Sequence, residues 1–371
     1  MKFRCERDGL VEALSTAGRA VSTRGGALPV LSGVRLEVHG NDLRLAGSDL
    51  DLTIEVSTTV AGLADGICVL PARLAADIVR SLEPGSVVFE SDDDEVRISS
   101  GRSQFAVRML PAEEFPRLPF PAEASAEGDA FTLPSAILAD ALRQVVRSAS
   151  TDDAIPVISG VLMAAEGTGL RLVATDRYRL AVRDLPGTSV LREGQKVLVP
   201  SKALSELQRL LTGSDAEVSV RLGERDASFE VGSVRLSTRL IEGEFPDYQR
   251  LIPSTHANRL VIGKEALLDA VRRVRLLVRD AITPVRVSFR ADGIECTVIT
   301  QEVGQATEDV DGKYEGSELV VGFNPGYLID GVEAIVGDEV LVETSSDPMR
   351  PVTVKATEGD DYLYLLMPVR L

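Results

Sequence analysis

The residues best suited to holding a metal ion are four consecutive acids, Asp92 to Glu95, and two histidines, His39 and His256. Metal sites need several ligands at fixed spacings, as in an HExxH helix, and neither histidine has such a companion. The acidic run is far better explained as the solvated tip of a hairpin than as a metal site. We therefore predict no metal site and no cofactor.

The sequence also lacks the familiar motifs for nucleophilic catalysis and phosphate transfer. The sequence contains no GxxxxGK[ST] phosphate loop and no GxSxG turn, and Gly25-Gly26 fits neither pattern. Three cysteines, far apart and in no CxxC pair, predict reduced and mostly buried thiols at Cys5, Cys68 and Cys296. No catalytic residue is predicted. An enzyme stays the weaker alternative, and it requires polymerase or nuclease activity in the purified chain.

The basic residues are more informative than the acidic ones. The formal net charge of −17 at first argues against a nucleic-acid partner. Six segments with helical spacing nevertheless carry a surplus of three positive charges, against a deficit of twenty for the remainder. A basic helical surface attracts phosphate without reading bases, but the preference of arginine for helices explains the same distribution. Both explanations stay open for these segments: 8–21, 71–82, 134–149, 200–211, 264–279 and 325–336.

The elements that position these helices repeat along the chain. Leu28–Val34 (LPVLSGV) returns as Ile155–Val161 (IPVISGV), 127 residues later, and a weaker third copy begins at Thr283. A period of this length is that of a whole domain, because solenoid repeats span only about 20–50 residues. Three such repeats fill the chain, and we place the domains at 1–120, 129–252 and 258–371.

Each repeat has the same order of predicted elements. An amphipathic helix with apolar residues three or four positions apart comes first, as at Leu10, Leu14, Ala17 and Val21. Strands with period-two alternation follow, and a second helix begins at a proline, which the first helical turn tolerates. Further strands close the repeat. The predicted fold class is α+β, with two helices and antiparallel sheets in each domain.

The start of the chain predicts a cytoplasmic protein. Lys2-Phe3-Arg4-Cys5-Glu6-Arg7 is polar and charged, without the apolar stretch of a signal peptide. No apolar run approaches the roughly 18–20 residues that a membrane span needs. We therefore expect no membrane partner.

Several motifs together resemble the bacterial β sliding clamps, the beta subunits of DNA polymerase III. The resemblance runs from the first residue to the last, in order and at the expected spacing, and it accounts for the three repeats. Each motif alone is weakly specific, and together they are highly specific. They are Met1–Phe3, Leu28–Leu31, Ala174–Leu180, Gly243–Tyr248, Asp347–Pro351 and Met367–Leu371.

The resemblance implies domains of the DNA-clamp type in a closed ring of two subunits joined head to tail. Such a ring encircles duplex DNA without regard to sequence and slides along it. It implies a processivity factor, a non-catalytic accessory subunit. Implied partners are the replicative polymerase, the clamp loader and repair proteins, which bind by short linear peptides. The implied location is the cytoplasm, on the nucleoid during replication. A scaffold unrelated to DNA remains a third hypothesis, and it predicts no retention on circular DNA.

The resemblance also implies site residues. For DNA they are Arg24, Arg73, Arg80, Arg143, Arg147 and Lys202. For the dimer interface they are Leu276 and Leu277 of the third domain, facing Ile78 and Phe105 of the partner's first domain. For the peptide pocket they are Ile158, Thr175, Arg177, Tyr178, Arg179, Leu180, Pro246, Arg250, Leu251, Met349, Pro351, Leu366, Met367, Pro368, Val369, Arg370 and Leu371.

Four positions depart from the usual family pattern. Arg177 and Tyr178 stand where Gly and His are frequent, and Ile155 stands where Arg is usual. Asp152 replaces a polar uncharged residue near DNA, which weakens that contact. These departures leave the pocket in place but alter its rim and its peptide preference.

Overall fold

The computed structural model describes residues 1–22, 28–92, 94–116, 130–152, 154–167, 169–188, 191–192, 194–280, 283–359 and 361–371. The chain forms two compact units. The first contains Met1–Ala136 and Glu206–Leu240, and the second contains Ile137–Ser205 and Ile241–Leu371. These units differ from the three sequence repeats because the central repeat contributes strands to sheets of both units.

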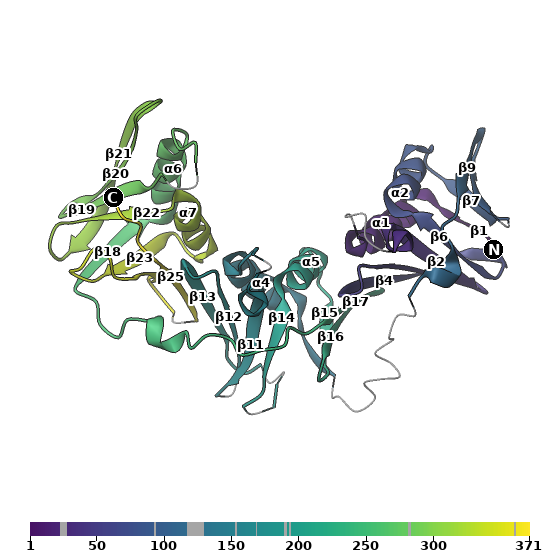
Figure 1. Ribbon diagram of the computed structural model, residues 1–371, viewed down its shortest axis with the longest axis horizontal. Coiled ribbons are helices and arrows are strands. Elements are labelled where there is room, and N and C mark those ends of the chain that lie inside the picture. Colours follow the sequence, from purple (N-terminus) through teal and green to yellow (C-terminus); the bar gives the residue numbers. More distant parts are fainter. Residues whose placement is uncertain are drawn as a thin grey trace. The chain divides into compact units, whose positions relative to one another are not determined.

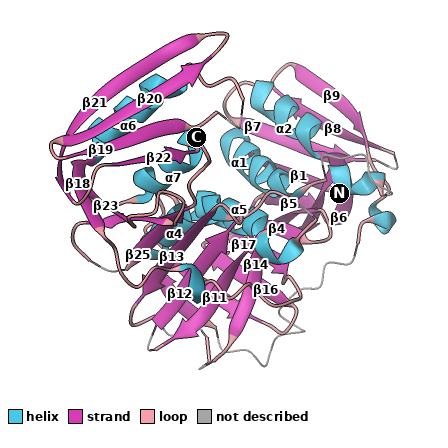
Figure 2. Cartoon of the chain, turned by 60° about the vertical axis from the view of Figure 1, so that its left-hand side comes forward, coloured by secondary structure: helices cyan, strands magenta, loops and turns pink. Residues whose placement is uncertain are grey.

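The first unit contains two antiparallel sheets. One has the order β5-β1-β7-β8-β9 and the other the order β10-β15-β16-β17-β4-β3-β2-β6. Helices α1 (Arg7–Ala17) and α2 (Ala72–Ser81) pack side by side against strands of this unit (Figure 2). The strands are β1 (Lys2–Glu6), β2 (Gly33–His39), β3 (Asp42–Ser48), β4 (Leu52–Thr59), β5 (Ala61–Ala64), β6 (Gly66–Pro71), β7 (Ser86–Ser91), β8 (Glu95–Ser100), β9 (Ser103–Arg108), β10 (Phe131–Pro134), β15 (Glu217–Leu222), β16 (Asp226–Val231) and β17 (Val234–Arg239).

The second unit is built on one antiparallel sheet of twelve strands, in the order β14-β11-β12-β13-β25-β24-β23-β18-β21-β20-β19-β22. Helices α6 (Lys264–Arg275) and α7 (Pro325–Ala334) pack side by side (Figure 1). The central repeat supplies α4 (Ser135–Val145) and α5 (Ser201–Leu211). The strands are β11 (Gly160–Glu166), β12 (Gly169–Thr175), β13 (Arg179–Leu185), β14 (Lys196–Pro200), β18 (Asn258–Gly263), β19 (Val285–Arg290), β20 (Gly293–Thr300), β21 (Gly304–Glu315), β22 (Leu319–Phe323), β23 (Glu339–Thr344), β24 (Val352–Ala356) and β25 (Tyr362–Leu366).

The predicted helix starts at prolines are confirmed. Pro71 is the N-cap residue of α2, and Pro200 immediately precedes α5. Pro325 opens α7, where the Asn324 side chain accepts hydrogen bonds from the backbone N–H groups of Gly326 and Tyr327. An N-cap acceptor of this kind satisfies backbone donors that have no partner within the helix.

The repeated LPVLSG and IPVISG motifs form the same local structure. Each makes a short 3-10 helix, η2 (Pro29–Ser32) and η5 (Pro156–Ile158), that ends next to a glycine at the start of a strand. A Cβ at Gly33 would lie 2.6 Å from a methyl carbon of Val69, and a Cβ at Gly160 would lie 2.7 Å from that of Ile241. In both copies the backbone carbonyl oxygen of the paired strand also lies 3.0 Å from the position of this Cβ, so both glycines occupy similarly crowded positions.

Several predicted absences concern the part of the chain that is described. There, no helix is long and apolar enough to cross a membrane, and no cluster of acidic, histidine or cysteine side chains could hold a metal ion. The described residues of the acidic run lie at the predicted hairpin tip, since Asp92 and Asp94 fall between β7, which ends at Ser91, and β8, which begins at Glu95. Asp93 lies outside the described residues.

The cysteines are free thiols, as predicted. Cys68 and Cys296 are buried, and Cys5 is half-buried. Burial raises the pKa of all three thiols to about 12, because a thiolate is poorly solvated in an apolar interior. The thiols therefore stay protonated and unreactive at neutral pH.

Candidate functional site

A tight turn between β12 and β13 presents the most exposed aromatic side chain of the predicted pocket. The Thr175 hydroxyl donates to the backbone carbonyl of Arg179 at 2.7 Å and accepts from the backbone N–H of Arg177 at 3.2 Å. Asp176 Oδ1 accepts from the backbone N–H groups of Tyr178 and Arg179, both at 3.0 Å. These bonds fix the turn, and they leave the Tyr178 side chain 57% exposed.

The C-terminal strand lies directly beside this turn. In β25, Leu366 pairs with Arg179 and Leu365 pairs with Leu180, and the backbone N–H of Met367 donates to the Tyr178 carbonyl at 2.8 Å. On its other side, β25 pairs with β24 through Leu366 and Val352. The register therefore places Pro351, Met367 and Tyr178 at the same end of three adjacent strands.

The final residues continue away from this end and are also held in place. The backbone N–H of Val369 donates to the carbonyl of Gly322 at 2.8 Å. A Cβ at Gly322 would lie 2.6 Å from the Val369 carbonyl oxygen and 2.7 Å from a methyl carbon of Leu371. The C-terminal segment is thus packed against β22, and Leu371 remains 53% exposed.

One face of this sheet carries an apolar cluster. Leu180, Leu365 and Tyr248 are buried in it, and Val157 and Phe245 pack against it while staying partly exposed. The ring of Phe245 meets that of Tyr248 edge to face, with centroids 6.2 Å apart. Beside Tyr248, η6 (Gln249–Leu251) ends at Leu251, which is 48% exposed. Of the residues predicted for the pocket, Leu180 belongs to this cluster, which also gathers apolar side chains from distant segments of the chain.

The placement of Leu366 in the pocket is wrong. Because successive residues of a strand point to opposite faces, Leu366 lies opposite Leu365. It is fully buried, and it lines an apolar interior together with Leu260 and Phe323. Leu365, which lies in the apolar cluster with Leu180, was not among the predicted pocket residues.

Other predicted pocket residues differ in exposure. Ile158 is 2% exposed, whereas its neighbour Val157 packs against the apolar cluster. Met349 is 44% exposed, two residues before the half-buried Pro351. Pro246, Arg250 and Arg370 are exposed, and Met367, Pro368 and Val369 are half-buried.

Arg179 is not a free rim residue, contrary to the sequence interpretation. Its Nε donates to Asp176 Oδ2 at 3.0 Å and its Nη1 donates to Asp330 Oδ2 at 2.5 Å. Its Nη2 donates to the Arg147 carbonyl, and the guanidinium lies 4.3 Å from the centre of the Tyr327 ring. Only 10% of the side chain is exposed. Arg179 therefore joins the turn to helix α7 rather than offering donors to a ligand.

The six predicted DNA contacts lie in different settings. Arg24 lies outside the described residues. Arg73 and Arg80 are exposed on α2, where Arg80 donates to Asp77 at 2.7 Å and to the Ser15 hydroxyl at 3.1 Å. Lys202 is exposed in the first turn of α5.

Arg143 and Arg147 of the central repeat are tied to helix α7 of the third. Arg143 donates to Asp140 at 2.7 Å and to the backbone carbonyl of Glu333 at 3.3 Å. Arg147 donates to the Glu333 carboxylate at 2.9 Å. Asp140 is a local partner on the same helix, but helix placement alone could not reveal the contacts with Glu333, which lies 190 residues from Arg143 and 186 from Arg147.

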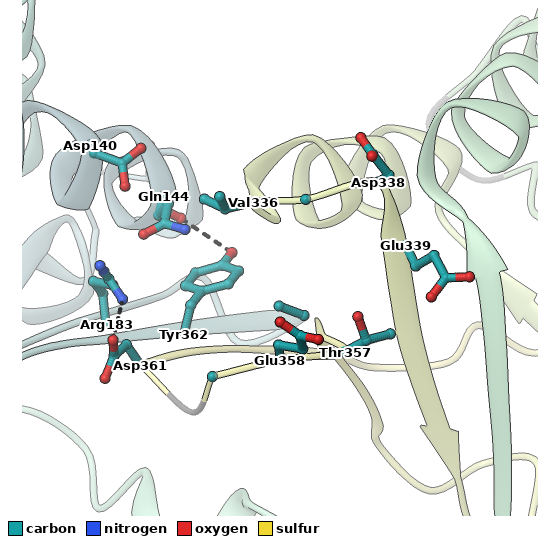
Figure 3. Close-up of a pocket in the computed structure, with 13 residues that line it drawn as sticks. Asp140, Gln144, Arg183, Val336, Asp338, Glu339, Thr357, Glu358, Asp361 and Tyr362 are labelled. Atoms are coloured by element: carbon teal, nitrogen blue, oxygen red, sulfur yellow. Dashed lines mark hydrogen bonds and ion pairs between the residues drawn. The ribbon is translucent and has the colours of Figure 1, made fainter.

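A large cavity of the second unit is unlike the predicted peptide pocket. It has a volume of about 860 Å³ between α4 and the β24–β25 loop (Figure 3). The carboxylates of Asp140, Asp338, Glu339, Glu358 and Asp361 line it, with Arg183 as the lining cation. A slot for apolar peptide anchors needs apolar walls, so this cavity does not serve that purpose.

Comparison with known proteins settles the family. Models of the N-terminal, central and C-terminal domains of the DNA polymerase III beta subunit match residues 1–119, 132–247 and 249–370. A beta sliding clamp of Streptomyces coelicolor is 36% identical, and the alignment covers all of both chains. The chain belongs to the DNA polymerase III beta subunit family.

Other members of this family agree in sequence and fold. The beta sliding clamp of Escherichia coli K12 is 31% identical over 86% of this chain and 87% of that one. The solved sliding clamp of Bacillus subtilis is 30% identical, with a TM-score of 0.91 over 100% of this chain and 99% of that one. A sliding clamp of Bartonella birtlesii, solved bound to griselimycin, is 31% identical with a TM-score of 0.91 over all of both chains.

Family membership establishes three domains of the clamp type and the role of a sliding clamp, the processivity factor of DNA replication. It makes the chain a non-catalytic accessory subunit of the polymerase. The enzyme hypothesis is therefore set aside on the basis of the relatives.

The residues predicted for the dimer interface of such a clamp differ in exposure. Leu276, which caps α6, is 76% exposed, and Leu277 is half-buried. Phe105 is 36% exposed on β9, the edge strand of its sheet. Ile78 is only 9% exposed, so it packs mainly inside the first unit.

The departure at Arg177 has a structural cost. This residue has a φ of 78°, a left-handed conformation that is unfavourable for a side chain and ordinary for glycine. Its guanidinium reaches Asp152 at only 3.9 Å, and both side chains are more than half exposed. A surface pair of that kind contributes little stability.

We expect Arg177→Gly to raise the free energy of unfolding by about 0.5–1 kcal/mol, because relief of strain exceeds the added freedom of the unfolded chain. Denaturant titration measures the change. Arg350→Gly is the matched control, since Arg350 is exposed and does not have a positive φ, and it should lower the stability. A loss of stability in Arg177→Gly would show that the turn is not strained.

Proposed function

We propose that two copies of the chain join head to tail in a closed ring around duplex DNA, and that the ring tethers the polymerase by a peptide pocket. The observation that carries the proposal is the match of three successive repeats, in order, to the three domains of the family. We keep domain limits of 1–120, 129–252 and 258–371. The proposed location is the cytoplasm, on the nucleoid during replication.

Two edge strands support the ring. β9 is the edge of its five-stranded sheet and pairs only with β8. In β21, residues 304–311 pair with β20, whereas the partner strand β18 begins to pair only at Gly312. Unpaired strand edges are templates for another chain, so pairing β9 of one copy with β21 of the next would satisfy both. We therefore place Leu276, Leu277 and Phe105 at the contact between copies.

The peptide pocket is proposed at the end of β13, β25 and β24. Its floor is Leu180 with Leu365, and its exposed apolar walls are Tyr178, Leu251 and Met349. An apolar surface of this kind suits Leu and Phe anchors of a short peptide. Arg177 and Arg250 are the exposed cations near it, with side chains 56% and 87% exposed. The proposed ligands are peptides of the polymerase, the clamp loader and repair proteins.

The proposed DNA contacts are sequence-independent. Arg73, Arg80 and Lys202 are exposed on helices, where each can neutralise a phosphate. Arginine and lysine bound to phosphate release counterions, which makes the affinity fall as salt rises. Diffuse contacts of this kind let a ring slide, whereas tight base contacts would hold it in place.

Replacing Arg80 and Lys202 together by alanine should weaken DNA binding about three- to tenfold for each phosphate contact that is lost. The slope of the logarithm of the binding constant against the logarithm of the salt concentration should become shallower by about one for each lost contact. Fluorescence anisotropy on duplexes of two unrelated sequences measures both effects. The matched control replaces Arg102 and Arg286, two exposed arginines outside the helices with the same total charge. A defect that depended on base sequence and not on salt, or an equal defect in the control, would contradict the proposed contacts.

A further inference from the structure

A small cavity among three helices brings together most of the charge on the helical surface of the second unit. It has a volume of about 280 Å³ and is lined by residues of α4, α6 and α7 and of the 3-10 helix η4 (Val146–Ser148). Glu333 of α7 uses both carboxylate oxygens there. Oε2 accepts from Nη1 of Arg147 at 2.9 Å, and Oε1 accepts from Nη2 of Arg272 at 2.8 Å.

Glu333 thereby joins an arginine of the central domain to one of the C-terminal domain. Its side chain is 33% exposed, and those of Arg147 and Arg272 are 57% and 45% exposed. Partial burial would raise the pKa of Glu333, but hydrogen bonds from Arg272 and Arg147 hold that pKa below its ordinary value. The carboxylate is therefore negatively charged at neutral pH, and it partly neutralises the positive charge of the two guanidinium groups.

The other cations around the cavity also have acceptors. Arg143 is held by Asp140 and by backbone carbonyls of α7. Lys264 donates to the Ile335 carbonyl at 2.6 Å. A carbonyl leaves the positive charge of a lysine in place, whereas a carboxylate cancels it. Asp330 also lies 3.6 Å from Arg147, and Asp269 lies 3.5 Å from Arg272. Among the described residues, Glu333 is the carboxylate that pairs with both arginines, and at the shorter distances of 2.9 and 2.8 Å.

We propose that Glu333 sets how strongly the clamp holds DNA, by occupying Arg147 and Arg272 so that fewer guanidinium groups of this surface can bind phosphate. The proposal rests on the proposed function, because it requires this helical surface to face DNA. A processivity clamp must remain on DNA while moving along it. An acid among the bases weakens the phosphate contacts of the surface without affecting topological retention, and so favours sliding over a tight hold.

The test uses Glu333→Gln in the full-length protein and a fluorescent linear duplex at several salt concentrations. Glutamine keeps the size of the side chain but removes the charge. Release of at least one arginine should tighten DNA binding about three- to tenfold at low salt. The slope of the logarithm of the binding constant against the logarithm of the salt concentration should become steeper by about one. Adding both Arg147→Gln and Arg272→Gln to this variant should return the slope to that of the wild type, because both released guanidinium groups are then absent.

Glu358→Gln is the matched control. Glu358 is an exposed carboxylate of the same unit, and within the described residues it has no side-chain partner. The two variants change the net charge equally, so a general electrostatic effect would appear in both. The proposal expects an unchanged salt slope in Glu358→Gln.

Equal slopes for Glu333→Gln and the wild type, or equal effects of Glu333→Gln and Glu358→Gln, would overturn the proposal. If the wild-type protein binds the duplex with a salt-dependent affinity, and the affinity and salt slope of Glu333→Gln equal those of the wild type, only the inference about Glu333 fails. If the wild type shows no salt-dependent binding, the proposed DNA contacts fail first. Glu333→Ala is the second variant. If neither Glu333→Gln nor Glu333→Ala folds, the carboxylate is required for the stability of the fold, and the proposal is also overturned.

Discussion

Replacing Leu276 and Leu277 by aspartate should convert the dimer into folded monomers. Leu276 is the most exposed large apolar residue of the described chain, at 76%, which is typical of a residue that another protein covers. Loss of two central apolar contacts should weaken association by about 4 kcal/mol or more, roughly a thousandfold in Kd. Sedimentation equilibrium measures the mass, and the monomer has a mass of 39.8 kDa.

A matched control separates interface loss from a general effect of the added charge. Leu63 is also strongly exposed, at 63%, but it lies on β5, at the opposite edge of the sheet from β9. Leu63→Asp should leave the dimer intact. An unchanged dimer after both leucine substitutions at 276 and 277 would place the interface elsewhere.

Deleting Met367–Leu371 should abolish peptide binding while leaving the dimer intact. A short peptide with spaced Gln, Leu and Phe anchors should bind the wild type at roughly micromolar affinity, about −8 kcal/mol. The deletion removes the Met367 wall beside Tyr178 and releases the Val369 hydrogen bond to Gly322. Isothermal titration calorimetry should therefore detect no binding by the truncated protein.

Two point variants show whether the deletion acts through the pocket. Met367→Ala should weaken the peptide by about 1–2 kcal/mol, whereas Arg370→Ala, a neighbouring exposed change, should have a smaller effect. Equal peptide binding by the wild type and the deletion would move the pocket elsewhere. A deletion that also dissociated the dimer would contradict the separation of the two sites.

Features that depend on local sequence were predictable. The proline helix starts at Pro71, Pro200 and Pro325 depend on backbone chemistry within a few residues, and the structure confirms them. The repeated motif was visible in the sequence, whereas the close contacts at Gly33 and Gly160 could be identified only from the structure.

Features that depend on long-range pairing were not predictable. Arg179 looked like a rim donor until the structure placed Asp330 of α7 against it, 151 residues away. Leu366 and Leu365 are adjacent in sequence, and only the pairing of β25 with β13 decides which one shares a face with Leu180. The contacts of Arg143 with the Glu333 backbone carbonyl and of Arg147 with the Glu333 carboxylate were missed for the same reason.

Retention on circular DNA tests the central claim most directly. Protein loaded onto a nicked circular duplex by a clamp loader should remain bound through gel filtration in salt high enough to abolish phosphate contacts. Linearising the same DNA with a restriction enzyme should release it, because a ring slides off a free end. The account predicts retention on the circle and loss from the linear form. Equal retention on both, or no retention on the circle after loading, would contradict it.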